Sequence, residues 1–146
     1  MTEEDFHRHF DLNVLGTILA TQEAIEAFDG KGGSVINLST ISSVNPVPMA
    51  SLYSTSKAAV DTLTRAAALE LAARNIRVNA IAPGMTETDT VAAAGINLES
   101  AKAMGAVLPI GRFGKPQDIA RVALFLASDQ SSWLTGERIS ASGGQR

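Results

Sequence analysis

The sequence predicts an α/β fold in which a short parallel sheet of about three strands lies between two layers of helices. Helical periodicity alternates with short apolar runs along the 146 residues, in the order α-β-α-β-α-β. The apolar runs are typical of strands buried on both faces, and the helices between them are long enough for crossover connections. A chain of this length can bury one core, so residues 1–146 are expected to form a single domain.

The first expected element is a helix over residues 3–29. Thr2 can cap this helix, and Asp5 occupies the reciprocal position of a capping box. Apolar residues recur at helical spacing in two stripes, and a helix with two apolar stripes is usually packed on both sides. The second stripe consists of Leu12, Leu15 and Leu19. GKGG at 30–33 ends the helix with a glycine cap and a turn.

Two strands flank the next helix. SVINLS (34–39) is rich in apolar residues and bounded by turn signals, which predicts a short buried strand. A long helix is predicted over 51–74, where RAAALELAAR has high helix propensity, and Asn75 can end it in the left-handed conformation. IRVNAIA (76–82) predicts a second buried strand.

The last part of the chain adds one helix and one strand. The second strand ends sharply at the Pro-Gly pair 83–84, Pro116 opens a helix that runs to about Ser128, and a final strand is expected over 137–142. Ligands of parallel sheets bind at the carboxyl ends of the strands. A site is therefore expected to be built from residues 39–50, 83–95 and 143–146.

Composition argues against several classes of function. A net charge of −3 gives no electrostatic reason for a nucleic-acid or anionic-membrane partner. The absence of cysteine excludes disulfides and thiolate metal sites and fits a reducing compartment. The opening MTEEDFHRHF lacks the apolar region of a secretory signal, and no apolar run is long enough to cross a membrane. We therefore expect a cytoplasmic protein without a metal site.

The strongest chemical signal is YSTSK, residues 53–57. It places the only tyrosine four residues before a lysine, on the same face of a predicted helix. A free phenol is too weak an acid for efficient proton transfer at neutral pH, but a neighbouring ammonium stabilises the phenolate. A contact on the helix surface would leave the same pattern. The pair alone therefore leaves both interpretations open.

The motifs around this pair resemble those of the short-chain dehydrogenase/reductase family, whose members transfer hydride between NAD(P) and an alcohol or carbonyl. INLSTISSVNPVPMASLYSTSKAAV (36–60) resembles the family's catalytic segment, and FDLNVLG (10–16) its asparagine-bearing helix. RVNAIAPGMTETD (77–89) resembles the Pro-Gly strand end that faces the nicotinamide, and residues 111–144 resemble the closing helix and strand. The likeness covers essentially the whole chain and is strongest to the 3-oxoacyl-carrier-protein reductase and glucose dehydrogenase type. It implies part of a Rossmann fold.

The resemblance also implies roles for individual residues. Tyr53 would be the acid–base residue, Lys57 would support it and bind the nicotinamide ribose, and Asn13 would hold a water in a relay toward Lys57. The family's catalytic serine, thirteen positions before the tyrosine, is Thr40 here, which keeps the hydroxyl but adds a methyl group. Ser39, Ser42 and Ser43 are nearby alternatives. The implied cofactor-binding residues are Leu38, Ser39, Tyr53, Lys57, Pro83, Gly84, Met85, Thr86 and Thr88.

Without the resemblance, several of these residues have structural explanations. Asn13 would be a solvated residue in mid-helix, and the segment 83–88 a turn followed by a helix cap. His7 and His9 match no motif and are expected on the surface, and Trp133 is expected to pack structurally.

Two glycine-containing family motifs do not occur in the chain, the T-G-x-x-x-G-x-G turn and the N-N-A-G strand end. GKGG follows a helix and cannot replace that turn, which normally binds the pyrophosphate. The chain thus resembles the carboxyl-terminal portion of the family, without the dinucleotide-binding half. We expect NAD or NADP to bind weakly or not at all. We also expect a homo-oligomer through helices 3–29 and 51–74 and the open edge of strand 34–39.

Three interpretations of function stay open on the sequence. The chain is an NAD(P)-dependent oxidoreductase of small alcohols or carbonyls, an inactive fragment or pseudoenzyme that serves as an oligomeric assembly module, or a catalytic portion whose nucleotide-binding half is a separate chain. The sequence selects neither the substrate nor NAD over NADP.

Overall fold

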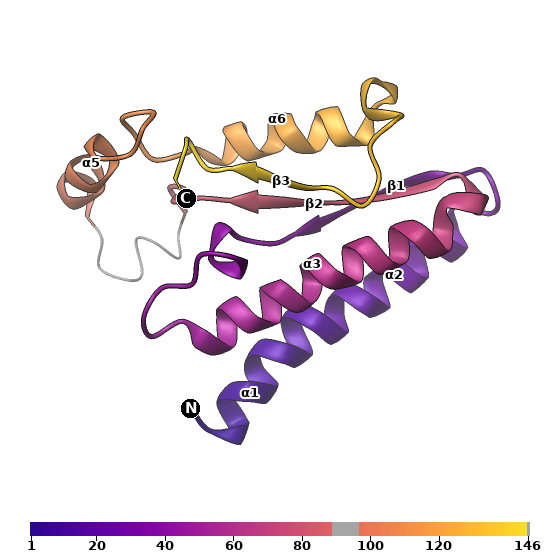
Figure 1. The fold of residues 1–146 in the computed structure, drawn as a ribbon, viewed down its shortest axis with the longest axis horizontal. Helices are drawn as coiled ribbons and strands as arrows, with labels where there is room; N and C mark the ends of the chain where they lie inside the picture. Colours follow the sequence, from indigo (N-terminus) through magenta and orange to yellow (C-terminus); the bar gives the residue numbers. More distant parts are fainter. Residues whose placement is uncertain (89–96, 146) are drawn as a thin grey trace.

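In the computed structural model of the chain, which describes residues 1–88 and 97–145, three parallel strands form one sheet with helices on both faces (Figure 1). The strands are β1 (Gly33–Leu38), β2 (Ile76–Pro83) and β3 (Arg138–Ala141), in that spatial order. Helices α1, α2 and α3 lie on one face and α6 on the other, which confirms the predicted three-layer arrangement. The helices are α1 (Glu3–Phe10), α2 (Gly16–Ala27), α3 (Ser51–Leu71), α5 (Leu98–Ala106) and α6 (Pro116–Ala127).

The first predicted helix consists of two α-helices joined by a π-helical segment, Asp11–Leu15. The capping box at its start is confirmed, because the Thr2 hydroxyl accepts from the Asp5 N–H and the Asp5 carboxylate accepts from the Thr2 N–H. The stripe of Leu12, Leu15 and Leu19 is exposed, at 75, 50 and 51 % of its surface. Packing of this helix on both sides is therefore not achieved within the chain itself.

Helix α3 packs closely on the sheet because its inner face carries small side chains. Ala67 and Ala68 contact the strands, and the buried Thr64 hydroxyl accepts a 2.9 Å hydrogen bond from the Asn37 amide of β1. The principal core cluster consists of Val35, Ala67, Ala68, Leu71, Ile76 and Val78. The helix ends in a 3₁₀ turn at Ala72–Arg74, and Asn75 takes the predicted left-handed conformation with φ 56°.

Strand β1 is an edge strand, because in the described part of the chain it pairs with β2 alone. A groove runs along its free side, between β1 and helix α2. Small side chains of α2 line the groove opposite the strand, namely Gly16, Thr17, Ala20, Thr21 and Ala24. The open edge predicted for this strand is therefore present.

Two features of the fold differ from the sequence-based expectation. Helix α5 was not predicted, because its short apolar pattern is weak. Trp133 does not pack structurally, since its side chain is 97 % exposed. Its neighbour Ser131 is buried and bonds to the carbonyl of Leu126, and the Leu134 N–H closes a turn onto Ser131. These bonds hold the backbone so that Trp133 points outward.

The GKGG turn lies at the amino end of β1, away from the carboxyl ends of the strands. A Cβ at Gly33 would come within 2.5 Å of the Phe28 ring, so a larger residue there would displace that ring from its place against the core. The turn thus has a packing role where helix α2 meets the sheet. None of the described helices combines the length and the apolar character that crossing a bilayer requires.

Candidate active site

A cavity of about 470 Å³ opens at the carboxyl ends of β1 and β2, where the sequence predicted a site. Three segments far apart in the chain form most of its walls, namely the residues after β1, the start of α3 and the end of β2 with the residues after it, and Gln145 after β3 completes the lining. The lining residues are Ser39, Thr40, Ile41, Ser42, Asn45, Val47, Tyr53, Pro83, Gly84, Met85, Thr86, Thr88 and Gln145. The structure thus brings most of the predicted site residues together.

The first wall is a 3₁₀ turn that follows β1 directly. The Ser39 N–H donates to the Ile81 carbonyl over 2.8 Å, which extends the sheet ladder to the edge of the cavity. Thr40 caps the turn Ile41–Ser43, because its hydroxyl oxygen accepts from the Ser42 N–H at 3.3 Å. A hydroxyl that accepts in this way keeps its own proton for donation. Thr40 is buried and lines the cavity, so its hydroxyl can donate a hydrogen bond to a ligand there.

Tyr53 and Lys57 lie on the first two turns of α3, and both are half-buried. Tyr53 lines the cavity. The Lys57 ammonium donates a 2.9 Å hydrogen bond to the carbonyl oxygen of Leu38, the last residue of β1. Burial lowers the pKa of Lys57 from its ordinary value, and the carboxylate of Asp61 opposes that shift. Lys57 therefore stands at the carboxyl end of β1, one helical turn from the phenol-bearing residue.

Asn13 lies in the π-helical segment, outside the cavity lining. Its amide donates a 3.0 Å hydrogen bond to the hydroxyl of Ser56, which is fully buried. The Ser56 hydroxyl in turn donates to the Tyr53 carbonyl over 2.8 Å. In the structure Asn13 therefore supports the turn of α3 that carries Tyr53. π-Helical segments are frequent at functional sites. The water relay toward Lys57 stays a prediction.

The third wall is the segment after β2. The Gly84 N–H donates to the Ala141 carbonyl at 3.1 Å, and a Cβ on Gly84 would lie 2.8 Å from the Cα of Ser142. Only glycine fits this approach. The Thr86 hydroxyl donates to the Gly84 carbonyl at 2.9 Å, which folds the segment back beside the cavity.

Gln145 lies in the segment 143–146 that the sequence assigned to the site, whereas His9, whose ring lies beside Tyr53, was expected on the surface. Gln145 accepts a 3.0 Å hydrogen bond from the Met85 N–H and lines the cavity, and its only sequence signal was its place just after the last strand. His9 is half-buried, and its ring centroid lies 6.3 Å from that of Tyr53 in an edge-on arrangement. His9 is therefore not a plain surface residue, whereas His7 is exposed as expected.

The cavity has the size of a small-molecule site. Hydroxyl-bearing side chains line it, and Lys57 lies outside the lining, at the carboxyl end of β1. At this end of the sheet the described residues contain the glycine pair Gly143–Gly144 after β3, but no turn with the T-G-x-x-x-G-x-G pattern that binds a pyrophosphate. In the same described residues, no group of three His, Asp or Glu side chains is placed to hold a metal ion.

Comparisons with known proteins agree with this geometry. Residues 1–146 match a family model described as enoyl-(acyl carrier protein) reductase. The chain is 46 % identical over its whole length to an uncharacterized oxidoreductase of Methylorubrum extorquens, of which it covers 59 %. It is 44 % identical over 98 % of its length to a 3alpha-hydroxysteroid dehydrogenase of Mediterraneibacter gnavus, of which it covers 57 %.

A solved structure shows the same arrangement. ElxO, solved as a tyrosine-to-phenylalanine variant with NADPH bound, is 30 % identical to the chain. It superposes with a TM-score of 0.87 over 99 % of the chain and 59 % of the ElxO chain. The chain thus spans less than two thirds of the length of the relatives it matches. With this fold, these motifs and these relatives, the chain belongs to the short-chain dehydrogenase/reductase family.

Proposed function

We propose that the cavity is the catalytic end of an NAD(P)-dependent oxidoreductase that acts on a small alcohol or carbonyl compound. The observation that carries this proposal is that Thr40, Tyr53 and the segment 83–88 line one cavity, with Lys57 one turn beyond Tyr53. A phenol, a hydroxyl and an ammonium together provide proton transfer to oxygen.

A bound nicotinamide supplies or accepts the hydride at the substrate carbon. In the reducing direction the Tyr53 hydroxyl gives its proton to the substrate oxygen, and in the oxidising direction the phenolate takes it back. The Thr40 hydroxyl donates a hydrogen bond to the same oxygen and orients it. The Lys57 ammonium stabilises the phenolate that forms when Tyr53 gives up its proton. Asn13 acts through Ser56, which holds the backbone of the Tyr53 turn.

The proposed cofactor contacts are those that the sequence indicated. Leu38, Ser39 and Lys57 would hold the ribose side, and the residues after β2 would hold the nicotinamide, namely Pro83, Gly84, Met85, Thr86 and Thr88. The NADPH in the ElxO structure supports the choice of cofactor class. The T-G-x-x-x-G-x-G turn that binds the pyrophosphate in this family does not occur in the sequence. We therefore expect weak nucleotide binding by the 146-residue chain itself.

The test follows NADH and NADPH consumption with a ketosteroid, a small aliphatic ketone and an aldehyde, together with a fluorescence titration of both nucleotides. We expect turnover that depends on Tyr53, and weak nucleotide binding. Turnover that is equal in the wild type and in Tyr53→Phe would contradict the catalytic assignment. Micromolar nucleotide affinity of the isolated chain would contradict the expectation about the missing contacts.

A second proposal concerns assembly, and two observations favour it. The edge of β1 is unpaired in the described chain, and the apolar stripe Leu12, Leu15 and Leu19 is exposed on the same side of the sheet. Unpaired edges and exposed apolar stripes are surfaces on which chains associate. We propose a homo-oligomer formed through the α1–α2 segment, α3 and this edge. The alternative that the chain serves only as an assembly module predicts the oligomer without turnover.

Sedimentation at micromolar concentration tests the assembly. The wild type is expected to sediment as a dimer or larger, and Leu15→Glu as a smaller species. Leu124→Glu is the matched control, since it makes the same change at an exposed leucine of α6 on the opposite face of the sheet. A wild-type monomer would contradict the proposal, as would equal effects of the two substitutions.

A further inference from the structure

A buried ion pair joins helix α3 to strand β3 beside the cavity. The Nε atom of Arg138 lies 3.0 Å from the Oδ2 atom of Asp61. The Asp61 side chain is 4 % exposed and that of Arg138 is 16 % exposed. Neither residue has a role in the proposed chemistry, although both charged side chains are largely removed from solvent in this contact.

The guanidinium of Arg138 also bonds to the Thr40 turn. Arg138 Nη2 donates to the carbonyl oxygen of Thr40 over 2.8 Å, and Arg138 Nε also contacts the Ser43 hydroxyl at 3.1 Å. Ser43 lies within hydrogen-bond distance of both the Asp61 carboxylate and the Thr40 carbonyl. The Nη1 branch of the guanidinium reaches the Ser140 hydroxyl. The Nε and Nη2 branches end on the turn Thr40–Ser43 or on the Asp61 carboxylate, which orients Arg138.

Stability alone does not account for this arrangement. Replacing a buried ion pair by apolar residues of similar volume is often neutral or stabilising, because desolvation offsets the attraction between the charges. Here the Oδ1 atom of Asp61 is buried without a hydrogen-bond partner in the described structure, which adds to the cost. The pair does, however, tie the turn Thr40–Ser43 to helix α3 and strand β3.

We propose that Asp61 and Arg138 are positioning residues that hold Thr40 so that its hydroxyl faces the cavity. This inference rests on the proposed role of Thr40. Asp61 orients the guanidinium of Arg138, and the guanidinium holds the Thr40 carbonyl. Asp61 also follows Lys57 by one helical turn, and its charge favours the protonated form of that lysine. The pair thus supports two of the proposed catalytic residues.

The test combines amide hydrogen exchange with kinetics in the double variant Asp61→Leu/Arg138→Met. The apolar pair removes the network at a small cost in folding stability. Four backbone amides report on the turn, those of Ser42, Ser43, Val44 and Asn45. Each donates to the hydroxyl or carbonyl of Thr40 or to the carbonyl of Ile41. We expect their exchange to accelerate about tenfold while the β2 amides of Val78 and Ala80 keep the wild-type rates.

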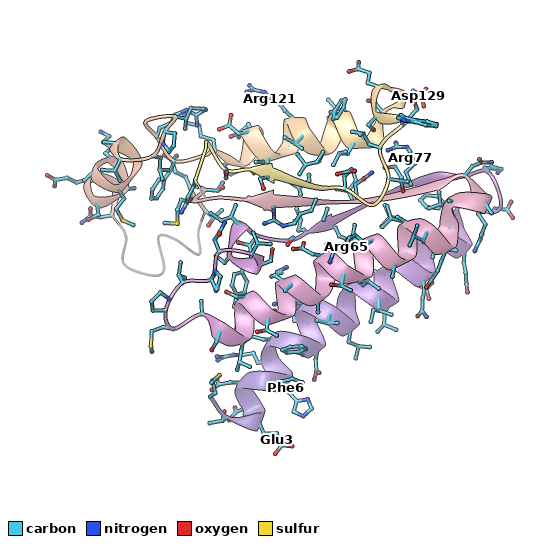
Figure 2. All side chains as sticks on the ribbon, in the orientation of Figure 1. Glu3, Phe6, Arg65, Arg77, Arg121 and Asp129 are labelled. Atoms are coloured by element: carbon cyan, nitrogen blue, oxygen red, sulfur yellow. The ribbon has the colours of Figure 1, made fainter. Side chains whose placement is uncertain are left out.

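Arg77→Met is the matched control. Arg77 also donates to backbone carbonyls, those of Leu126 and Ser128, but it lies near Asp129 at the opposite end of the sheet (Figure 2). Its substitution should leave exchange in the Thr40 turn unchanged. Arg138→Lys is a second, milder variant, which keeps the charge next to Asp61 but lacks the planar fork that reaches Asp61 and Thr40 together. It should also accelerate exchange in the turn.

The kinetic readout separates positioning from general destabilisation. The double variant is expected to lower kcat at least about tenfold while KM for the nucleotide stays unchanged. Wild-type exchange rates at Ser42–Asn45 in both the double variant and Arg138→Lys would overturn the inference, whether or not turnover is seen. So would acceleration that is matched at Val78 and Ala80. Absence of turnover in the wild type, by contrast, counts against the proposed function alone.

Discussion

The ammonium nitrogen of Lys57 lies 2.9 Å from the carbonyl oxygen of Leu38 and donates a hydrogen bond to it. This contact ties the second turn of α3 to the last residue of β1. Because Tyr53 precedes Lys57 by one turn, the same contact helps to fix the phenol beside the cavity.

Lys57 should make the stability of the protein depend on pH in the alkaline range. Burial lowers the pKa of Lys57 in the folded state, so the unfolded state binds the proton more tightly. The cost of burying the charge is fully present below the folded pKa and is relieved as pH rises toward the unfolded value of about 10.4. Wild type should gain stability relative to Lys57→Met when urea denaturation is repeated at increasing pH. A constant difference between the two proteins would contradict this prediction.

Thr40 should tolerate loss of its methyl group but not of its hydroxyl. Thr40→Ser keeps the proposed hydrogen bond to the substrate oxygen, so kcat/KM should stay within about threefold of wild type, a difference under 1 kcal/mol. Thr40→Val has nearly the same shape without the hydroxyl, and it should lower kcat about 100-fold, as for the loss of one transition-state hydrogen-bond donor. Steady-state kinetics of the two variants decide this. Equal activities would exclude Thr40 as the substrate-binding hydroxyl.

Asn13→Ala should destabilise the contact between the π-helical segment and α3. The substitution removes the 3.0 Å hydrogen bond to buried Ser56, whose hydroxyl still donates to Tyr53. We expect a loss of about 1 kcal/mol in the free energy of unfolding, measured in urea. Gln22→Ala, at an exposed position of α2, is the control and should change stability by less than about 0.5 kcal/mol. A loss no larger than that of the control would show that the bond contributes little.

The cap of α6 should make stability depend on pH in the acid range. Arg112 and the Lys115 N–H both donate to the Asp118 carboxylate, at 2.7 and 2.8 Å, and they lower the pKa of Asp118 to about 2. This contribution is present above the unfolded pKa of about 4 and is lost as pH falls toward 2. The stability difference between wild type and Asp118→Asn should therefore shrink over that range. Asp129→Asn makes the same change at an exposed position at the other end of the helix and serves as the control for the substitution itself.

Many elements of this fold could be predicted from local sequence signals. The Thr2–Asp5 capping box, the left-handed Asn75 and the three strands were predictable because each depends on residues that are close in sequence. The cavity was predictable from topology, since the carboxyl ends of parallel strands meet at one edge of the sheet. The family motifs then indicated which side chains to expect there.

The rest depends on contacts between distant residues. Arg138 reaches Thr40 across 98 positions, and no local pattern marks either it or Asp61 as part of the site. The outward orientation of Trp133 depends on backbone bonds around the buried Ser131, so its large apolar side chain was misleading. The π-helical segment around Asn13 has an ordinary helical sequence. Its geometry becomes visible only in the folded chain.

Comparing wild type with Tyr53→Phe decides whether Tyr53 transfers the proton in nicotinamide-dependent chemistry. Both proteins are assayed for NADH- and NADPH-dependent reduction of the carbonyl panel, with unfolding curves recorded in parallel. We expect Tyr53→Phe to lower kcat at least about 100-fold while folding stability is retained. Wild-type activity in Tyr53→Phe would contradict this expectation.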